Sequence, residues 1–229
     1  MRAYLGGVFR IAWKDLLLEF RRLSGLTAML VLAVSIILAF SFCFGVTTLR
    51  RLGPERVVPA ILWISLLFSS LSGLRMSFAS ERDRETLTAL VLSPLDASAI
   101  YFGKLLANLT LVSILEAFIL PITAVLFGWD LFLTFPAVVF VVFLHSFGFV
   151  AIGTFFAAMV TRLRQGDALM AILILPLSVP LIISAGNTTG AAIAGRPLAE
   201  VSFWLGLTAV FDLVSLAASL LVFEYLVEE

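Results

Sequence analysis

The amino-acid sequence predicts an all-α integral membrane protein with six transmembrane helices that follow an amphipathic interfacial helix. Hydrophobic residues make up 62% of the chain and charged residues 13%, and the mean hydropathy is +1.14. A soluble domain is about half apolar and about a quarter charged, so most of this chain's surface must face lipid. The net charge is zero, which gives no reason to expect nucleic acid as a partner.

The first element, residues 1–24, is predicted to be an amphipathic helix that lies in the membrane interface. Its apolar face at helical spacing is formed by Leu5, Phe9, Trp13, Leu16, Phe20 and Leu23, and the opposite face carries Arg10, Lys14 and Arg21. Such a helix places its basic residues towards lipid phosphate and Trp13 at headgroup depth. Ile11, Leu17 and Leu18 interrupt the pattern, which leaves packing against the bundle as an alternative.

Six later stretches are long and apolar enough to cross a bilayer, which takes about 20 residues. They cover residues 26–48, 57–80, 105–127, 135–160, 168–185 and 203–226. The fourth apolar stretch starts at Leu131, and we expect its helix to begin near Pro136. In the fifth, Pro176 and Pro180 predict a kinked or broken helix. Gly186–Ser202 is predicted to form a shallow re-entrant or interfacial turn.

The distribution of Lys and Arg predicts that both termini are cytoplasmic. Eleven lie before the first span and in the second–third and fourth–fifth connections: Arg2, Arg10, Lys14, Arg21, Arg22, Arg75, Arg82, Arg84, Lys104, Arg162 and Arg164. Four lie on the other side: Arg50, Arg51, Arg56 and Arg196. The segment 81–104, the one sizeable polar insert, therefore also faces the cytoplasm, where a soluble partner could push on it.

The residues needed for several kinds of chemistry are missing from the sequence. No G-x-x-x-x-G-K-[ST] loop is present, since Lys104 follows Gly103 without the earlier glycine. One histidine and one cysteine, Cys43, supply neither a zinc motif nor a disulfide framework. Nor is there a G-x-S-x-G elbow, so we expect no catalytic residues and no metal site.

Four polar residues in or near the predicted spans are candidates for function, because a charge in lipid costs roughly 2.5–3.5 kcal/mol on insertion scales. For Glu116, a structural contact between helices and a transport pathway remain equal alternatives. For Asp212 the structural role is favoured. His145 is predicted to be a buried histidine bonded to a neighbouring helix, with a ligand role as the alternative. Arg75 is close enough to the cytoplasmic end to reach the interface.

Several motifs resemble the permeases of ABC-2 transporters and, more narrowly, the haem exporter protein B (CcmB) family of bacterial cytochrome c maturation. They are W-K-D-L-x-x-E-x-R (Trp13 to Arg21), F-S-F (Phe40 to Phe42), P-A-I-L-W-I (Pro59 to Ile64), F-A-S-E-R (Phe78 to Arg82), L-x-L-S-P-L-D-x-S-A-I-Y-F-G-K-L-L-x-N (Leu90 to Asn108) and E-x-x-x-x-P (Glu116 to Pro121). The second half of the chain resembles the family mainly in hydropathy. Glu85 stands where the family usually has glycine.

The resemblance implies a non-catalytic permease in the bacterial inner membrane. Its expected partners are a CcmA-like ATPase subunit that holds the ATP, a CcmC-like haem-handling protein, a CcmE-like haem carrier, a second copy of the permease and membrane lipid. The implied step is ATP-dependent haem export or release of the haem-loaded carrier. Haem would be a handled ligand, and no cofactor is expected to bind this chain tightly.

In such transporters a short coupling helix fits a groove on the ATPase, and we expect it at about Glu85–Pro94. Thr86 would cap it, and Leu87, Leu90 and Val91 recur at helical spacing to fill the groove, with Glu81 just before them. The alternative is that this apolar face lies on the membrane. Two other functions stay open: a permease for another amphiphile, such as a lipid, drug or polysaccharide, and a proton-coupled carrier that uses Glu116.

Overall fold

Helices long enough to cross a bilayer make up most of the computed structural model, which describes residues 2–82, 96–160 and 166–228. The elements are α1 (Arg2–Arg22), α2 (Ser24–Leu52), α3 (Pro54–Arg82), α5 (Ala97–Phe127), α6 (Leu131–Val160), α7 (Gly166–Ile193), the 3₁₀ turn η1 (Leu198–Val201) and α8 (Ser202–Glu228). Within these residues, six helices have the length and apolar composition of membrane spans. The predicted all-α, six-span fold class is confirmed.

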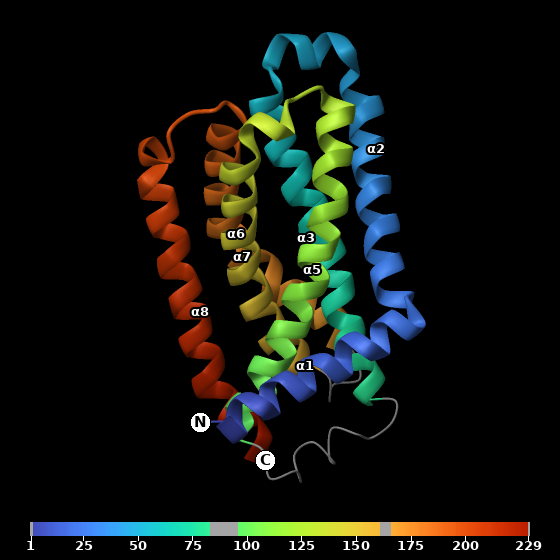
Figure 1. Cartoon of the computed structure of the whole chain (residues 1–229), viewed down its shortest axis with the longest axis vertical. Coiled ribbons are helices and arrows are strands. Elements are labelled where there is room, and N and C mark those ends of the chain that lie inside the picture. Colours follow the sequence, from blue (N-terminus) through green and yellow to red (C-terminus); the bar gives the residue numbers. More distant parts are fainter. Residues whose placement is uncertain (1, 83–95, 161–165, 229) are drawn as a thin grey trace.

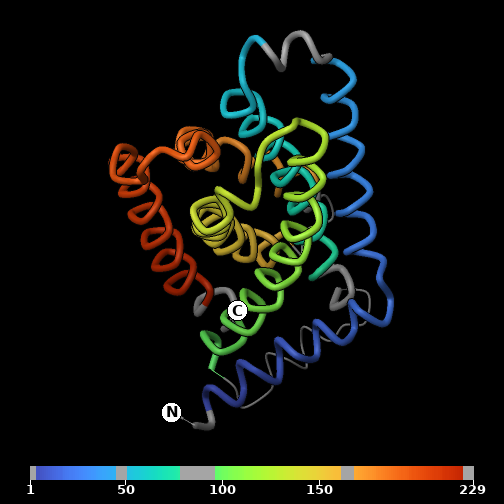
Figure 2. The backbone as a smooth tube through the Cα atoms, turned by 45° about the horizontal axis from the view of Figure 1, so that its top comes forward, coloured from blue at the N-terminus to red at the C-terminus, as the bar shows by residue number. Residues whose placement is uncertain are grey.

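The six long helices run side by side, and α1 lies across one end of them (Figure 1). This end, called the α1 end below, also holds the ends of α3, α6 and α8 and the starts of α2, α5 and α7. Helix α6 is central and packs against α3, α5, α7 and α8 (Figure 2). In the two helices at the sides, α2 and α8, only 22% of the residues of the apolar span are buried.

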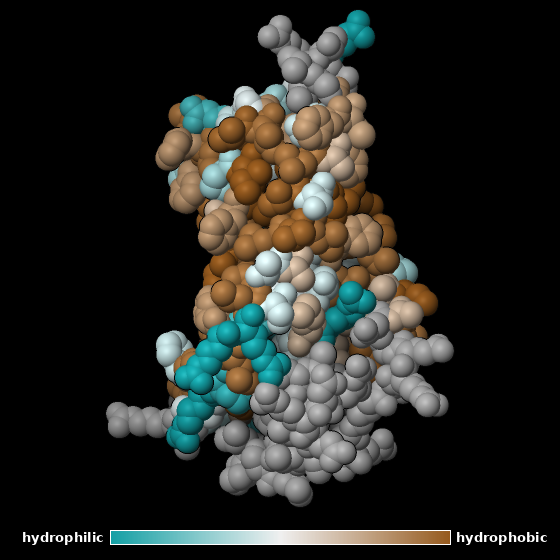
Figure 3. Space-filling view, turned by 90° about the vertical axis from the view of Figure 1, so that its right-hand side faces the viewer, coloured by the Kyte–Doolittle hydropathy of each residue, from teal (hydrophilic) through white to brown (hydrophobic). Residues whose placement is uncertain are grey.

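The exposed apolar side chains form the surface expected for a protein in lipid. A hydrophobic band crosses the face shown in Figure 3, and hydrophilic residues border it nearer the α1 end. Phe42, Phe132 and Leu133 are among the most exposed of the large hydrophobic side chains. Lipid tails solvate such side chains as well as a protein core does, so their exposure costs nothing in a bilayer.

Glycine residues in a left-handed conformation explain where three of the helices end, α2, α5 and α7. Gly53, with φ of 77°, ends α2, and Pro54 starts α3 at the position where proline's missing N–H is no loss. Gly128 (φ 67°) closes α5, where its N–H donates to the Ala124 carbonyl at 2.9 Å. Gly195 (φ 66°) follows α7. These turns let neighbouring helices run antiparallel.

The helices of the predicted spans extend beyond their predicted limits, and the differences in α5, α6 and α7 have identifiable causes or consequences. Helix α5 begins at Ala97 instead of near residue 105, so Gly103 and Lys104 lie inside it. Helix α6 begins at Leu131 rather than near Pro136, because Asp130 Oδ1 caps it by accepting a bond from the Leu133 N–H at 3.1 Å.

The largest difference is in α7, which continues through Pro176 and Pro180 to Ile193 where a turn was expected after Ala185. Its last two turns are rich in small and hydroxyl residues, and two of these, Thr189 and Gly190, contact α3. A Cβ on Gly190 would lie 2.7 Å from the Glu55 carbonyl oxygen, and Trp63 Nε1 of α3 donates to Thr189 Oγ1 at 2.9 Å. Small residues here serve helix packing, not a loop.

The sharp turn from α1 into α2 depends on Glu19. Leu23 adopts a left-handed conformation with φ of 55°, which costs a residue with a side chain roughly 1–2 kcal/mol. Glu19 Oε1 accepts a hydrogen bond from the Leu26 N–H at 2.8 Å, and the carboxylate fills the space beside Gly25. Glu19 therefore satisfies one of the free N–H groups at the start of α2 and holds the two helices at their angle.

Replacing Glu19 with Ala should lower the free energy of unfolding by about 1 kcal/mol, because the cap on α2 is lost. Glu19→Gln is the matched control, since its amide oxygen can still accept the Leu26 N–H bond. Thermal unfolding of the detergent-solubilised protein measures both. Equal destabilisation by the two variants would show that the charge, rather than the cap, matters.

Candidate functional site

Most of the predicted coupling residues lie outside the described part of the chain: Glu85, Thr86, Leu87, Leu90, Val91 and Pro94. Glu81 belongs to the last turn of α3, but its side chain is also outside the described residues. What the structure describes is the two ends of this segment, where α3 stops at Arg82 and α5 starts at Ala97. Both ends lie at the α1 end of the bundle (Figure 1).

Helix α1 packs along the first turns of α5, so it lies beside the place where the segment enters the bundle. The Tyr4 hydroxyl donates to Ser98 Oγ at 3.1 Å. Further along, Gly103 has no side chain, and a Cβ there would lie 2.7 Å from Ile11 Cβ and 3.0 Å from the Val8 carbonyl oxygen. Because Gly103 has no Cβ, the two helices can approach this closely.

An ion pair with one partner almost completely buried joins the same two helices. Lys104 Nζ of α5 lies 2.8 Å from Asp15 Oδ2 of α1, and the Lys104 side chain is only 1% exposed. The other carboxylate oxygen of Asp15 lies 3.0 Å from Lys14 Nζ, whose side chain is 45% exposed. A lysine this deeply buried needs a counter-charge, and Asp15 supplies it.

Three of the four predicted intramembrane residues, His145, Glu116 and Asp212, lie on or against one turn of the central helix α6, from His145 to Gly148. His145 lies on this turn, Ser146 donates a hydrogen bond to Glu116 of α5, and Gly148 lies against the Asp212 carboxylate of α8. Ser146 faces α5, whereas His145 and Gly148 both face α8, and His145 also contacts Ser184 of α7. The turn therefore connects α6 with α5, α7 and α8 through polar groups in the middle of the bundle.

His145 is fully buried in a network of hydroxyl groups. Its Nδ1 donates to the Val141 carbonyl at 2.7 Å, and its Nε2 lies 2.9 Å from Thr208 Oγ1 and 3.1 Å from Ser184 Oγ. The ring also lies against Trp63 of α3, with centroids 5.5 Å apart. Both ring nitrogens thus have partners inside the bundle.

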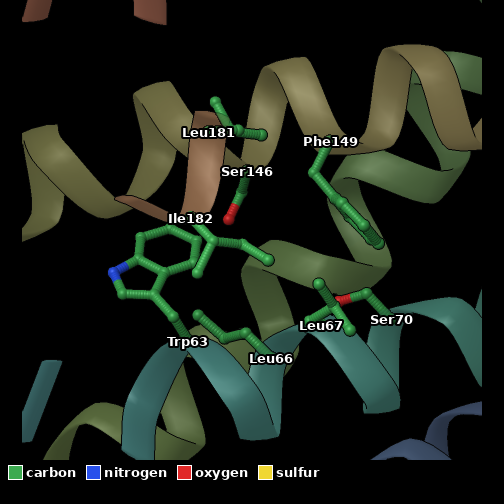
Figure 4. Close-up of a pocket in the computed structure, with 8 residues that line it drawn as sticks. All are labelled: Trp63, Leu66, Leu67, Ser70, Ser146, Phe149, Leu181 and Ile182. Atoms are coloured by element: carbon green, nitrogen blue, oxygen red, sulfur yellow. The ribbon is translucent and has the colours of Figure 1, made fainter. Parts of the chain in front are cut away.

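Glu116 is also buried, and its described hydrogen-bond partner is the Ser146 hydroxyl. Ser146 borders a cavity of about 20 Å³ between α3, α6 and α7 (Figure 4), which has room for a single water molecule. The cavity is lined by Trp63, Leu66, Leu67, Ser70, Ser146, Phe149, Leu181 and Ile182. It is too small for an amphiphile, so this conformation holds no open pathway there.

Asp212 differs from Glu116, because neither oxygen of its buried carboxylate has a hydrogen-bond partner among the described residues. Gly148 leaves the room for it, since a Cβ at that position would collide with Oδ1. Asp212 belongs to a buried polar face of α8 formed by Thr208, Asp212, Ser215 and Ser219. The opposite face of α8 is apolar and exposed. The structural and pathway hypotheses for Asp212 and Glu116 both stay predictions.

The sequence reasoning missed the ion pair and the α2 cap, although Asp15, Glu19 and Lys104 all belong to the motifs quoted above. Lys104 gave one signal that could have been used, since it stands between apolar residues at the start of a long apolar helix. Arg75 is half-buried near the α1 end of α3, and its Nε has no hydrogen-bond partner in the described part of the chain. Among the described residues, no three His, Cys, Asp or Glu side chains are grouped to hold a metal ion.

These features define a class: a polytopic α-helical membrane protein with an interfacial helix and a buried polar centre. A family model described as "CcmB protein" matches residues 7–225, so this chain belongs to the CcmB family, and the predicted family is confirmed. The chain is 32% identical to the heme exporter protein B of Paracoccus denitrificans over 194 residues, which is 80% of this chain and 87% of that protein.

Two further relatives of the same name match at similar levels. The heme exporter protein B of Pseudomonas aeruginosa is 26% identical, with 84% of this chain and 85% of that protein covered. The corresponding Escherichia coli K12 protein is 29% identical over 180 residues, with 74% and 80% covered. The similarity therefore extends over most of the length of each protein.

Gly148→Ala should lower the free energy of unfolding by about 1–3 kcal/mol, because the added methyl group collides with the Asp212 carboxylate. Gly206→Ala in α8 is the matched control, since a Cβ there meets nothing within 4 Å. Adding Asp212→Ala to Gly148→Ala should recover most of the loss. Thermal unfolding in detergent measures all three, and equal effects of the two glycine variants would contradict the close α6–α8 contact.

Proposed function

We propose that this chain is the membrane-spanning component of a haem exporter and that a separate ATPase subunit drives it. The observation that carries the proposal is the family match, which covers residues 7–225 and so includes all six spans. The relatives reported above are named heme exporter protein B. The chain itself has no phosphate-binding loop, so hydrolysis of ATP falls to the partner.

The proposed orientation puts the α1 end in the cytoplasm of a bacterium, with the bundle in the inner membrane. Eleven of the fifteen Lys and Arg residues belong to the N-terminal segment and to the two connections that lie at this end of the bundle. Lys and Arg are enriched on the cytoplasmic side of membrane proteins. The ATPase would then dock on the segment between Arg82 and Asp96, because this segment contains the coupling helix predicted at Glu85–Pro94. Helix α5, which continues directly from this segment, would carry the motion into the bundle.

Haem in this proposal is cargo handled by the complex rather than a group that His145 holds. Both nitrogens of His145 have partners within the bundle, and the side chain is fully buried. An axial ligand needs a free nitrogen that faces the iron. Haem would instead be transferred at a surface that this chain shares with a second copy of itself or with haem-handling partners of the CcmC and CcmE kind.

The test is co-purification of the tagged full-length chain with the ATPase subunit of the same organism. Changing Leu87 and Leu90 together to Asp should reduce the recovered ATPase at least tenfold, because two charges cannot fill an apolar groove. Thr88→Asp, which would put a charge on a neighbouring face of the predicted coupling helix, should leave recovery unchanged.

Production of c-type cytochromes in a strain that lacks the chain then tests the cargo. The unaltered chain should restore them, and the double aspartate variant should not. Undiminished ATPase recovery with the double variant would refute the coupling assignment. Normal c-type cytochromes in the strain without the chain would point to another amphiphile.

A further inference from the structure

We propose that Asp15 and Lys104 are positioning residues that fasten α1 to the start of α5, so that the two move as one body when the coupling segment is displaced. This inference rests on the proposed function, because it concerns how force enters the bundle. The inference also adds to the proposed function, because α1 would transmit motion and not only anchor the chain in the membrane interface.

The contacts between α1 and α5 lie close to the place where the coupling segment joins α5. The Tyr4–Ser98 hydrogen bond, the Ile11–Gly103 contact and the Asp15–Lys104 ion pair follow one another along α1 and all fall within α5 residues 97–104. These residues form about two turns immediately after the segment to which the partner is proposed to bind. Any displacement of the segment reaches these turns before it reaches the rest of α5.

The ion pair between Asp15 and Lys104 lies in a buried environment. A surface ion pair is worth little, but removing one partner of a buried pair leaves an uncompensated charge in a medium of low dielectric constant. Lys104 at 1% exposure is of this second kind. Separation of α1 from α5 would leave the Lys104 charge without its counter-charge. The ion pair therefore holds the two helices together more strongly than apolar contacts alone would.

Helix α1 is also attached to α2, so a displacement of α1 would reach α2. At its other end, Glu19 bonds to the Leu26 N–H and so ties α1 to the first turn of α2. The exposed face of α1 carries Leu5, Phe9, Trp13 and Phe20, which suit the interface of a membrane. Helix α1 therefore connects the start of α5 with the start of α2 along the membrane surface.

The test uses the complete transporter in a strain that lacks the native chain, and compares variants at equal amounts of membrane-inserted protein. Lys104→Met should lower c-type cytochrome content at least tenfold while the ATPase subunit still co-purifies. Lys14→Met is the matched control, because Lys14 contacts the same carboxylate from the exposed side. It should leave the cytochrome content unchanged.

A second variant separates positioning from folding. Replacing both partners, Asp15→Leu with Lys104→Met, removes the charges together, and such replacements usually preserve stability. The proposal predicts that this variant accumulates normally, binds the ATPase subunit and still yields at least tenfold less c-type cytochrome. A wild-type yield would overturn the proposal by showing that the pair serves stability alone. Failure of the unaltered chain to bind the ATPase would instead refute the proposed function.

Discussion

The interior of a bilayer holds no water, so every polar group in this bundle must find its partner in the protein or remain without one. Helix α6 supplies most of these partners. Its Ala151 carbonyl accepts the Tyr101 hydroxyl at 3.0 Å, its Thr154 accepts Asn108 at 3.0 Å, and His145 lies among hydroxyl groups of α7 and α8. Helix α6 thus makes polar contacts with α5, α7 and α8, which agrees with its central position in the bundle.

At the α1 end, a buried charged group likewise needs a partner within the protein. Lys104 belongs to a helix that enters the apolar region, and it is tolerated because α1 brings Asp15 to it. Helix α1 therefore presents apolar side chains away from the bundle and the Asp15 carboxylate towards it. A helix that only anchored the protein to lipid would need no inward-facing acid.

The sequence predicted the number and type of helices well, because hydropathy over about 20 residues depends on composition alone. Their ends were harder to predict. Asp130 extends α6 by a side-chain cap, and Gly190 and Thr189 extend α7 through contacts with α3 that are distant in sequence. The pairing of Asp15 with Lys104 could not be predicted for the same reason. It depends on where α1 turns, and that turn is fixed by the contact between Glu19 and Leu26.

The central claim, that α1 and the start of α5 move together, is tested most directly by linking them covalently. A Cβ at residue 103 would lie 2.7 Å from Ile11 Cβ, so the pair Ile11→Cys and Gly103→Cys can form a disulfide after a small shift, with Cys43→Ser removing the native thiol. ATP hydrolysis by the purified complex is measured before and after oxidation. The account predicts a rate unchanged within about twofold; a loss that dithiothreitol reverses would contradict it, because α1 would then have to leave α5 in each cycle.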